Sequence, residues 1–227
     1  MGIGRATFIR VMAGTIVVSL LAMLTASWLN GSNSDQTARP HLALLEHQTG
    51  ALRSGDLVFR QGKSALSNAV RTLDTGGTYS HVGIVARRGD AIDVLHVEPG
   101  RDVTHVESVK AEPLGNFLGG AQSWAVYRFD GLDGPSALGE RVVEIARDYV
   151  VQKTRFDSAM SLDDDNELYC TELVWRALTG ATGADLPLKE SQFRTPLGEW
   201  SIILPSAITS NNSFTEILKS TPDRRQK

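Results

Sequence analysis

The chain has 227 residues, of which 41% are hydrophobic, and a formal net charge of −3 at pH 7. Its lysines and arginines are scattered along the sequence, which argues against a nucleic-acid partner, because neutralising phosphates requires a concentrated basic face. The chain contains one cysteine, Cys170, so an intramolecular disulfide is excluded. Length and composition leave one ordinary domain with a substantial hydrophobic core.

Residues 1–29 differ from the rest of the chain. Arg5 and Arg10 precede an uncharged, mostly apolar run over residues 11–29. A basic start, an apolar segment and small residues at 25–27 are typical of a secretory signal peptide. The run is also nearly long enough to span a bilayer, so an uncleaved membrane anchor is the alternative. Both interpretations predict an exported protein, periplasmic or otherwise extracytoplasmic, because the basic residues lie before the apolar run.

The rest of the chain divides into three parts. Residues 30–48 are predicted to be a linker, because their Gly, Ser and Asn-rich beginning cannot bury a core. Residues 49–218 form the predicted domain, and residues 219–227 a disordered tail. Nothing in the sequence indicates an oligomeric state.

The first half of the domain predicts a strand, a helix and a β-hairpin. The strand covers residues 56–60, and the helix covers residues 64–73, where apolar side chains recur at helical spacing. Two further strands, at 80–86 and 91–98, are joined by the turn sequence Arg88-Gly89-Asp90, which favours a hairpin.

The second half predicts two long helices among shorter strands. Strands are expected at 103–106, 124–129 and 200–204. One helix begins at Pro135 and ends near Val151, since proline suits the first helical position, and the other begins at Cys170 and ends near Gly180. Strands and helices in this irregular order favour an α+β fold with a mainly antiparallel sheet packed against helices.

Cys170 has three interpretations: a small buried hydrophobe, an intermolecular bridge or a nucleophile. A nucleophilic cysteine needs a lowered pKa, because the thiolate is the reactive species. The N–H groups and partial positive charge of a helix N-terminus would lower the pKa of a thiol at this position. The position therefore favours the nucleophile.

Three histidines of the domain, His81, His96 and His105, are candidates for the base that accepts the thiol proton. His81 is favoured, because it begins a strand and shares a face with Gly83, which leaves space beside the ring. The hairpin turn pairs His81 with residues in the high nineties, which places Glu98 beside it. The Glu98 carboxylate would fix the imidazole tautomer and stabilise its protonated form. His96 shares a face with Glu98, so it is expected to line the cleft.

Five segments of the chain together resemble a known family. They are Gly55-Asp56-Leu57-Val58-Phe59, Tyr79-Ser80-His81-Val82-Gly83-Ile84-Val85, Glu98-Pro99, Phe156-Asp157 and Tyr169-Cys170-Thr171-Glu172-Leu173-Val174. Over about residues 52–205 the chain is similar to the YiiX/YebB-like branch of the NlpC/P60 superfamily, the circularly permuted papain-like cysteine hydrolases. The resemblance implies that fold, with Cys170 as nucleophile, His81 as base and Glu98 as the residue that orients His81. It also implies hydrolysis of amide bonds, often in cell-wall peptides, through an acyl-enzyme.

The oxyanion of such a reaction would be held by backbone N–H groups at the start of the Cys170 helix, with the Tyr79 hydroxyl as a further donor. Tyr169, His96 and Asp56 complete the candidates for the oxyanion site or the cleft. No cofactor and no metal are predicted, because the histidines lack ligand spacing. The acidic run 163–167 lacks the spacing and glycine of a calcium loop, so we expect a solvated loop that attracts a cationic substrate group.

The leading functional hypothesis is therefore an exported thiol amidase or peptidase that acts on peptides or peptidoglycan fragments. A second hypothesis keeps the same site but assigns it an acyl lipid or thioester, as a hydrolase or acyltransferase. A third is a non-catalytic binding protein of the cell envelope.

Overall fold

The computed structural model describes residues 48–99, 107–133, 137–162, 166–195 and 198–220. The predicted signal or anchor segment, nearly all of the linker, the strand at 103–106 and Pro135 lie outside these ranges, as does most of the acidic run. Within the described ranges, no helix combines the length and apolar character that a membrane span requires.

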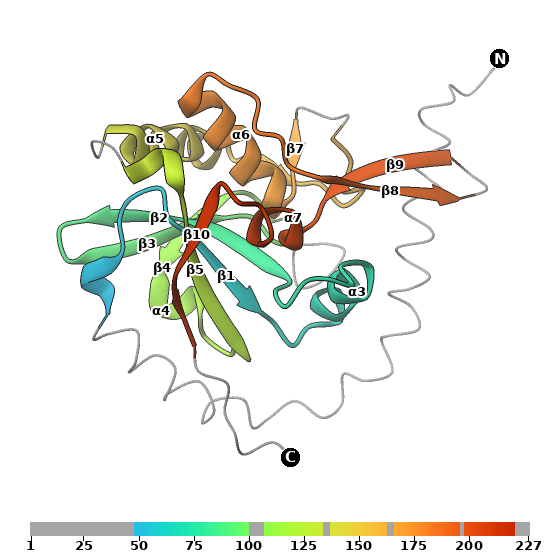
Figure 1. The fold of residues 1–227 in the computed structure, drawn as a ribbon, viewed down its shortest axis with the longest axis horizontal. Coiled ribbons are helices and arrows are strands. Elements are labelled where there is room, and N and C mark those ends of the chain that lie inside the picture. The colour runs from blue at the N-terminus through green and yellow to red at the C-terminus, as the bar shows by residue number, and fades with distance from the viewer. Residues whose placement is uncertain (1–47, 100–106, 134–136, 163–165, 196–197, 221–227) are drawn as a thin grey trace.

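A six-stranded sheet in the order β10-β5-β1-β2-β3-β4 forms the centre of the molecule (Figure 1). Every neighbouring pair in it is antiparallel. Two small sheets accompany it, a parallel β6–β7 pair and an antiparallel β8–β9 hairpin. The strands are β1 Leu57–Gln61, β2 His81–Arg88, β3 Ala91–His96, β4 Lys110–Pro113, β5 Ser123–Phe129, β6 Arg155–Phe156, β7 Glu167–Leu168, β8 Glu190–Thr195, β9 Gly198–Ile203 and β10 Phe214–Lys219.

Helices cover both faces of the large sheet. Its residues alternate between a core shared with α5 and α6 and a second core shared with α4, and Figure 1 shows α5 and α6 side by side over the sheet. A sheet covered on both faces requires strands that are apolar throughout, as β1 and β2 largely are. The helices are α3 Ala65–Leu73, α4 Leu114–Phe117, α5 Ala137–Gln152, α6 Cys170–Thr182 and α7 Pro205–Thr209, with short 3-10 turns at Thr49–Ala51 and Asp130–Asp133.

The predicted α+β fold with a mainly antiparallel sheet is confirmed, and several local predictions are corrected. Strands β4, β8 and β10 and helix α7 were not predicted, because these segments are short and have no regular apolar pattern. Helix α6 continues past Gly180 and ends at Thr182, with Gly183 as its left-handed cap. Gly180 stays helical, and a Cβ there would meet Ile145 of α5 at 3.0 Å. The described domain also extends to Ser220, whose hydroxyl accepts a hydrogen bond from the Trp124 amide.

A buried ion pair fixes the beginning of β1. Asp56 is 0% exposed, and its two carboxylate oxygens accept hydrogen bonds from Arg128 Nε and Nη2 at 2.7 and 2.8 Å. The same carboxylate accepts a hydrogen bond from the Arg53 amide. Because β5 carries Arg128, this contact ties the loop before β1 to its neighbouring strand.

Removing the Asp56 carboxylate should destabilise the fold strongly. We expect Asp56→Ala to lower the free energy of unfolding by about 3–5 kcal/mol, because it leaves the Arg128 guanidinium buried without its counter-ion. Urea denaturation followed by circular dichroism measures the change. Asp93→Ala is the control, since Asp93 pairs with the largely exposed Arg88 and should cost less than about 1 kcal/mol. Equal losses in the two variants would contradict the structural role of Asp56.

Candidate active site

The register of three strands brings the candidate residues together. The β2–β3 hairpin turns between Arg88 and Ala91, as predicted, and its ladder extends to the pair Ile84–Leu95. On the other side of β2, Arg60 of β1 pairs directly with His81. The beginning of β2 and the end of β3 therefore lie side by side, with Arg60 adjacent.

His81 and His96 form a buried pair at this point. His81 Nε2 lies 2.9 Å from His96 Nδ1, and the two residues are 8% and 0% exposed. The second nitrogen of His96, Nε2, lies 2.8 Å from Glu112 Oε1 on β4. A continuous line of polar contacts thus runs from His81 through His96 to Glu112.

Glu98 lies close to this pair, but other groups hold its carboxylate. Arg60 Nη2 donates to Glu98 Oε2, and Lys110 Nζ donates to Oε1 at 3.1 Å. In the structure His81 has a polar contact with His96, while two cations attract the Glu98 carboxylate. The role of Glu98 in orienting His81 stays a prediction.

Besides Glu112, the residues Phe117 and Arg60 of this site were not found from the sequence. The Phe117 ring of α4 stacks on His81 at a centroid distance of 5.4 Å and meets His96 edge-on at 5.0 Å. The Arg60 guanidinium lies 4.6 Å above the same ring and donates to the Phe117 carbonyl. Finding Arg60 would have required the β1–β2 register, and the four-residue helix that carries Phe117 has no periodicity to reveal it.

Gly83 is also explained by this packing. A Cβ at Gly83 would lie 2.4 Å from Val94 Cγ1 and 3.1 Å from His96 Cβ. The space that glycine leaves beside His81 is thus filled by the side chains of β3, and it is what allows His96 to approach.

Helix α6 brings Cys170 to the same strand. The backbone N–H groups of Val82, Thr171 and Cys170 itself lie close enough to the thiol to lower its pKa. Because Val82 follows His81 directly, the first residue of α6 lies against the beginning of β2. The hydroxyl of Thr171 donates to the Ile203 carbonyl, which ties the start of α6 to β9.

The expected lowering of the Cys170 pKa is not found. Burial raises the pKa of the thiol to about 11, and this outweighs the backbone N–H groups and Arg60, which lower it. Burial also holds the pKa of His81 well below 6.5, and Arg60, His96 and Lys110 lower it further. At neutral pH the resting site therefore holds a protonated thiol and a neutral imidazole.

The structure places the predicted tyrosines in the core. The Tyr169 hydroxyl accepts a hydrogen bond from the Ile203 amide at 3.0 Å, and the residue is 2% exposed, so that oxygen is already engaged beside β9. The Tyr79 ring packs 5.8 Å from Phe59 in the core against which Cys170 also packs. The role of Tyr79 as an oxyanion donor stays a prediction.

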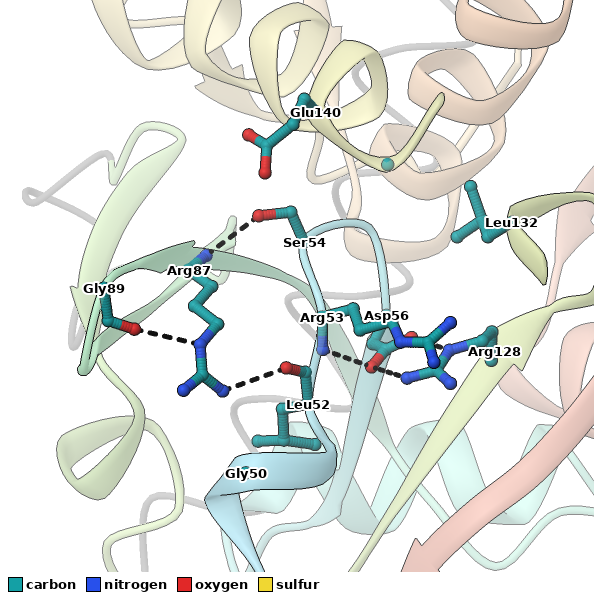
Figure 2. A pocket seen from close by; sticks show the side chains of 11 residues that line it. Gly50, Leu52, Arg53, Ser54, Asp56, Arg87, Gly89, Arg128, Leu132 and Glu140 are labelled. Atoms are coloured by element: carbon teal, nitrogen blue, oxygen red, sulfur yellow. Dashed lines mark hydrogen bonds and ion pairs between the residues drawn. The ribbon is translucent and has the colours of Figure 1, made fainter. Parts of the chain in front are cut away.

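Asp56 lies away from these residues. It borders a cavity of about 570 Å³ at the opposite ends of β1 and β2 from Arg60 and His81. Figure 2 shows the Asp56–Arg128 pair in this cavity and the Arg87 guanidinium directed at backbone carbonyls. Arg87 donates to the carbonyls of Thr49, Leu52 and Gly89, so these charges hold the chain that enters β1. The expectation that Asp56 shapes the cleft is corrected.

Comparison with known proteins agrees with this arrangement. Residues 51–218 match the profile of the permuted papain-like amidases, YaeF/YiiX, C92 family. The chain belongs to this family. The resemblance seen in the sequence motifs is thereby confirmed, and the C92 family is one of amidase enzymes.

Two individual proteins are also similar to this chain. The uncharacterized protein YiiX of Escherichia coli (strain K12) is 25% identical over 191 residues, covering 75% of this chain and 88% of that protein. The crystal structure of yiiX from Escherichia coli O157:H7, described as a metalloprotein, has a TM-score of 0.62 at 21% identity and covers 75% of this chain and 98% of its own. At that identity the second comparison shows the shared fold.

The protonation of Cys170 can be tested by alkylation. We expect the rate with iodoacetamide to rise about tenfold per pH unit from pH 7 to 10, because it follows the thiolate fraction of a thiol whose pKa is about 11. Stopped time courses analysed by intact mass spectrometry measure the rate. A rate that stays constant between pH 6 and 9 would instead show a preformed thiolate.

The charge of Arg60 should contribute to the pKa values of both Cys170 and His81. Arg60→Gln removes a cation that lowers the pKa of Cys170 and of His81, so the alkylation profile should move to higher pH. Lys63→Gln removes the same charge from an exposed position and is the matched control. The assignment fails if both variants keep the profile of the parent protein.

Proposed function

We propose that this protein is a thiol amidase that cleaves amide bonds through an acyl-enzyme on Cys170. The observation that carries the proposal is the packing of Cys170 against the core that contains Val82, whose amide is close enough to lower the pKa of the thiol. Val82 directly follows His81, so the thiol lies next to the strand position of a neutral, buried histidine. Membership of an amidase family supports the same chemistry.

The mechanism depends on which ring nitrogen of His81 already contacts another residue. Nε2 contacts His96, which leaves Nδ1 to accept the thiol proton. Since thiol and imidazole are both neutral at rest, the proton moves as Cys170 attacks the substrate carbonyl carbon. The same transfer creates the nucleophile and the general acid.

The later steps use the start of α6. Backbone N–H groups of the first turn would stabilise the tetrahedral oxyanion, and His81 then protonates the amine that leaves. Water attacks the resulting thioester, with His81 accepting its proton, and Cys170 is released as a thiol. No step requires the carboxylate of Glu98.

The proposed substrates are amides of peptides in the cell envelope, such as the peptides of peptidoglycan. Two features of the sequence support this: the resemblance to a superfamily whose members often cleave such peptides, and the basic and apolar segment at residues 1–29, which favours export. The same apolar segment would hold the enzyme near lipid if it is retained. This supports the second candidate, an acyl lipid or thioester as substrate.

The solved yiiX structure is described as a metalloprotein, and His81, His96 and Glu98 each offer one ligand atom within 4.8 Å of the others. This set does not fit a bound cation as it is arranged. Arg60 and Lys110 already neutralise Glu98, and a metal ion would have to displace their positive charges or lie beside them. It would also break the 2.9 Å contact between the two imidazoles. We therefore derive no step through a metal.

A comparison of products tests the proposal. The full chain and its Cys170→Ser variant are incubated separately with peptidoglycan fragments and with an acylated lipid, and released products are identified by mass spectrometry. We expect new amine and carboxylate ends from the fragments, with a rate at least about 10³-fold lower in Cys170→Ser and in His81→Ala.

Other outcomes of the same experiment point elsewhere. Release of fatty acid that depends on Cys170 would assign the site to lipids or thioesters. Equal product from the parent protein and Cys170→Ser would remove the catalytic role of the thiol. Urea denaturation of each variant serves as the folding control.

A further inference from the structure

We infer that Glu112 is a positioning residue, which fixes the catalytic tautomer of His81 by acting through His96. The inference rests on the proposed function, since it concerns the base of that reaction. Its basis is the geometry of three residues from β2, β3 and β4, and not the resemblance to any relative.

The proton positions follow from the order of the contacts. Glu112 Oε1 lies 2.8 Å from His96 Nε2, and this contact is electrostatic because it does not have hydrogen-bond geometry. A carboxylate has no proton to donate and repels a lone pair at that distance, so it favours a His96 ring proton on Nε2. When His96 is neutral it carries one ring proton, and its Nδ1 must then accept. The proton in the 2.9 Å contact therefore belongs to His81 Nε2, and His81 Nδ1 is left without a proton, as a base requires.

The packing around His96 prevents its ring from changing partners. His96 is 0% exposed, and the Phe117 ring lies edge-on to its ring at a centroid distance of 5.0 Å. The Cβ of His96 lies 3.1 Å from the position that a Cβ on Gly83 would take. A rotated ring would lose the 2.9 Å contact with His81 and leave that nitrogen buried without a partner, which is costly. Glu112 is thus the group that decides which nitrogen of His96 carries the proton.

The other charged groups around the pair do not replace Glu112. Glu98 is held by Arg60 and Lys110, and Glu107 lies 4.0 Å from Lys110. Contact with His96 also lowers the pKa of Glu112, which keeps this carboxylate an acceptor at neutral pH.

Loss of Glu112 should therefore change the tautomers of His96 and His81, and not only the stability of the fold. In Glu112→Ala, His96 is free to carry its proton on Nδ1 and donate it to His81 Nε2. The His81 proton then moves to Nδ1, where it blocks the transfer from the thiol. We expect kcat to fall about 10- to 100-fold, the usual effect of losing a group that orients a functional imidazole, with little change in KM.

Nitrogen-15 NMR of the imidazole side chains reads the tautomers directly in the full-length protein. The parent should show His81 and His96 protonated at Nε2, and Glu112→Ala should shift both towards Nδ1. Glu112→Gln keeps an acceptor oxygen, so it should recover part of the original tautomer and of kcat. Glu107→Ala, which removes a nearby carboxylate without contacting His96, should change neither; it is the matched control.

Failure of this inference can be distinguished from failure of the proposed function. Unchanged tautomers in both Glu112 variants would overturn the inference, whatever their activity. So would a loss of kcat in Glu107→Ala equal to that in Glu112→Ala. If the tautomers shift as expected but no variant or parent shows activity that depends on Cys170, the positioning role stands and the amidase proposal fails.

Discussion

The simultaneous pairing of β2 with β1 and β3 is the constraint on which the rest of this site depends. It places Arg60 opposite His81 and brings the end of β3 alongside the beginning of β2. Side chains alternate between two buried cores, so a slip of one residue would transfer every side chain of the strand to the opposite core. The geometry of the histidines is therefore secured by the whole core, and not by the local hydrogen bonds alone.

The second feature that shapes the site is its distribution of charge. Its cations are balanced by a carboxylate, whereas the thiol and its histidine do not form an ion pair with each other. Arg60 and Lys110 are matched by Glu98, while desolvation of the half-buried Cys170 and the buried His81 favours their uncharged forms at neutral pH. Keeping a thiolate and an imidazolium in such a place would require desolvating both. A protonated thiol is also a poor target for oxidants, because oxidation proceeds through the thiolate. Under the proposed mechanism, the thiol therefore loses its proton only as Cys170 attacks the carbonyl carbon of a substrate.

Much of this arrangement could be predicted from the sequence, and the limits have physical causes. The hairpin register followed from the turn at residues 88–90, and Cys170 was correctly placed at a helix start. Strand alternation treats His96 and Glu98 alike, because both lie on one face, and the sequence favoured Glu98 as the residue that orients His81. The contacts of Arg60 and Lys110 with Glu98 could not be predicted, because they depend on pairings between strands distant in sequence. Strands β8 and β10 are short and lack regular apolar alternation, so they are not recognised before their partners are known.

The order of the segments along the chain has a consequence for when the protein becomes chemically competent. During synthesis, β2 and β3 emerge early, but the helix that carries the thiol emerges only after β5 and α5. The last strand, β10, covers the edge of β5, so the central sheet is completed only at the end of the domain. A chain truncated before α6 carries both histidines but no thiol, and it lacks elements that complete the core. Neither the histidine geometry nor any chemistry of Cys170 can be in place before the domain is nearly complete.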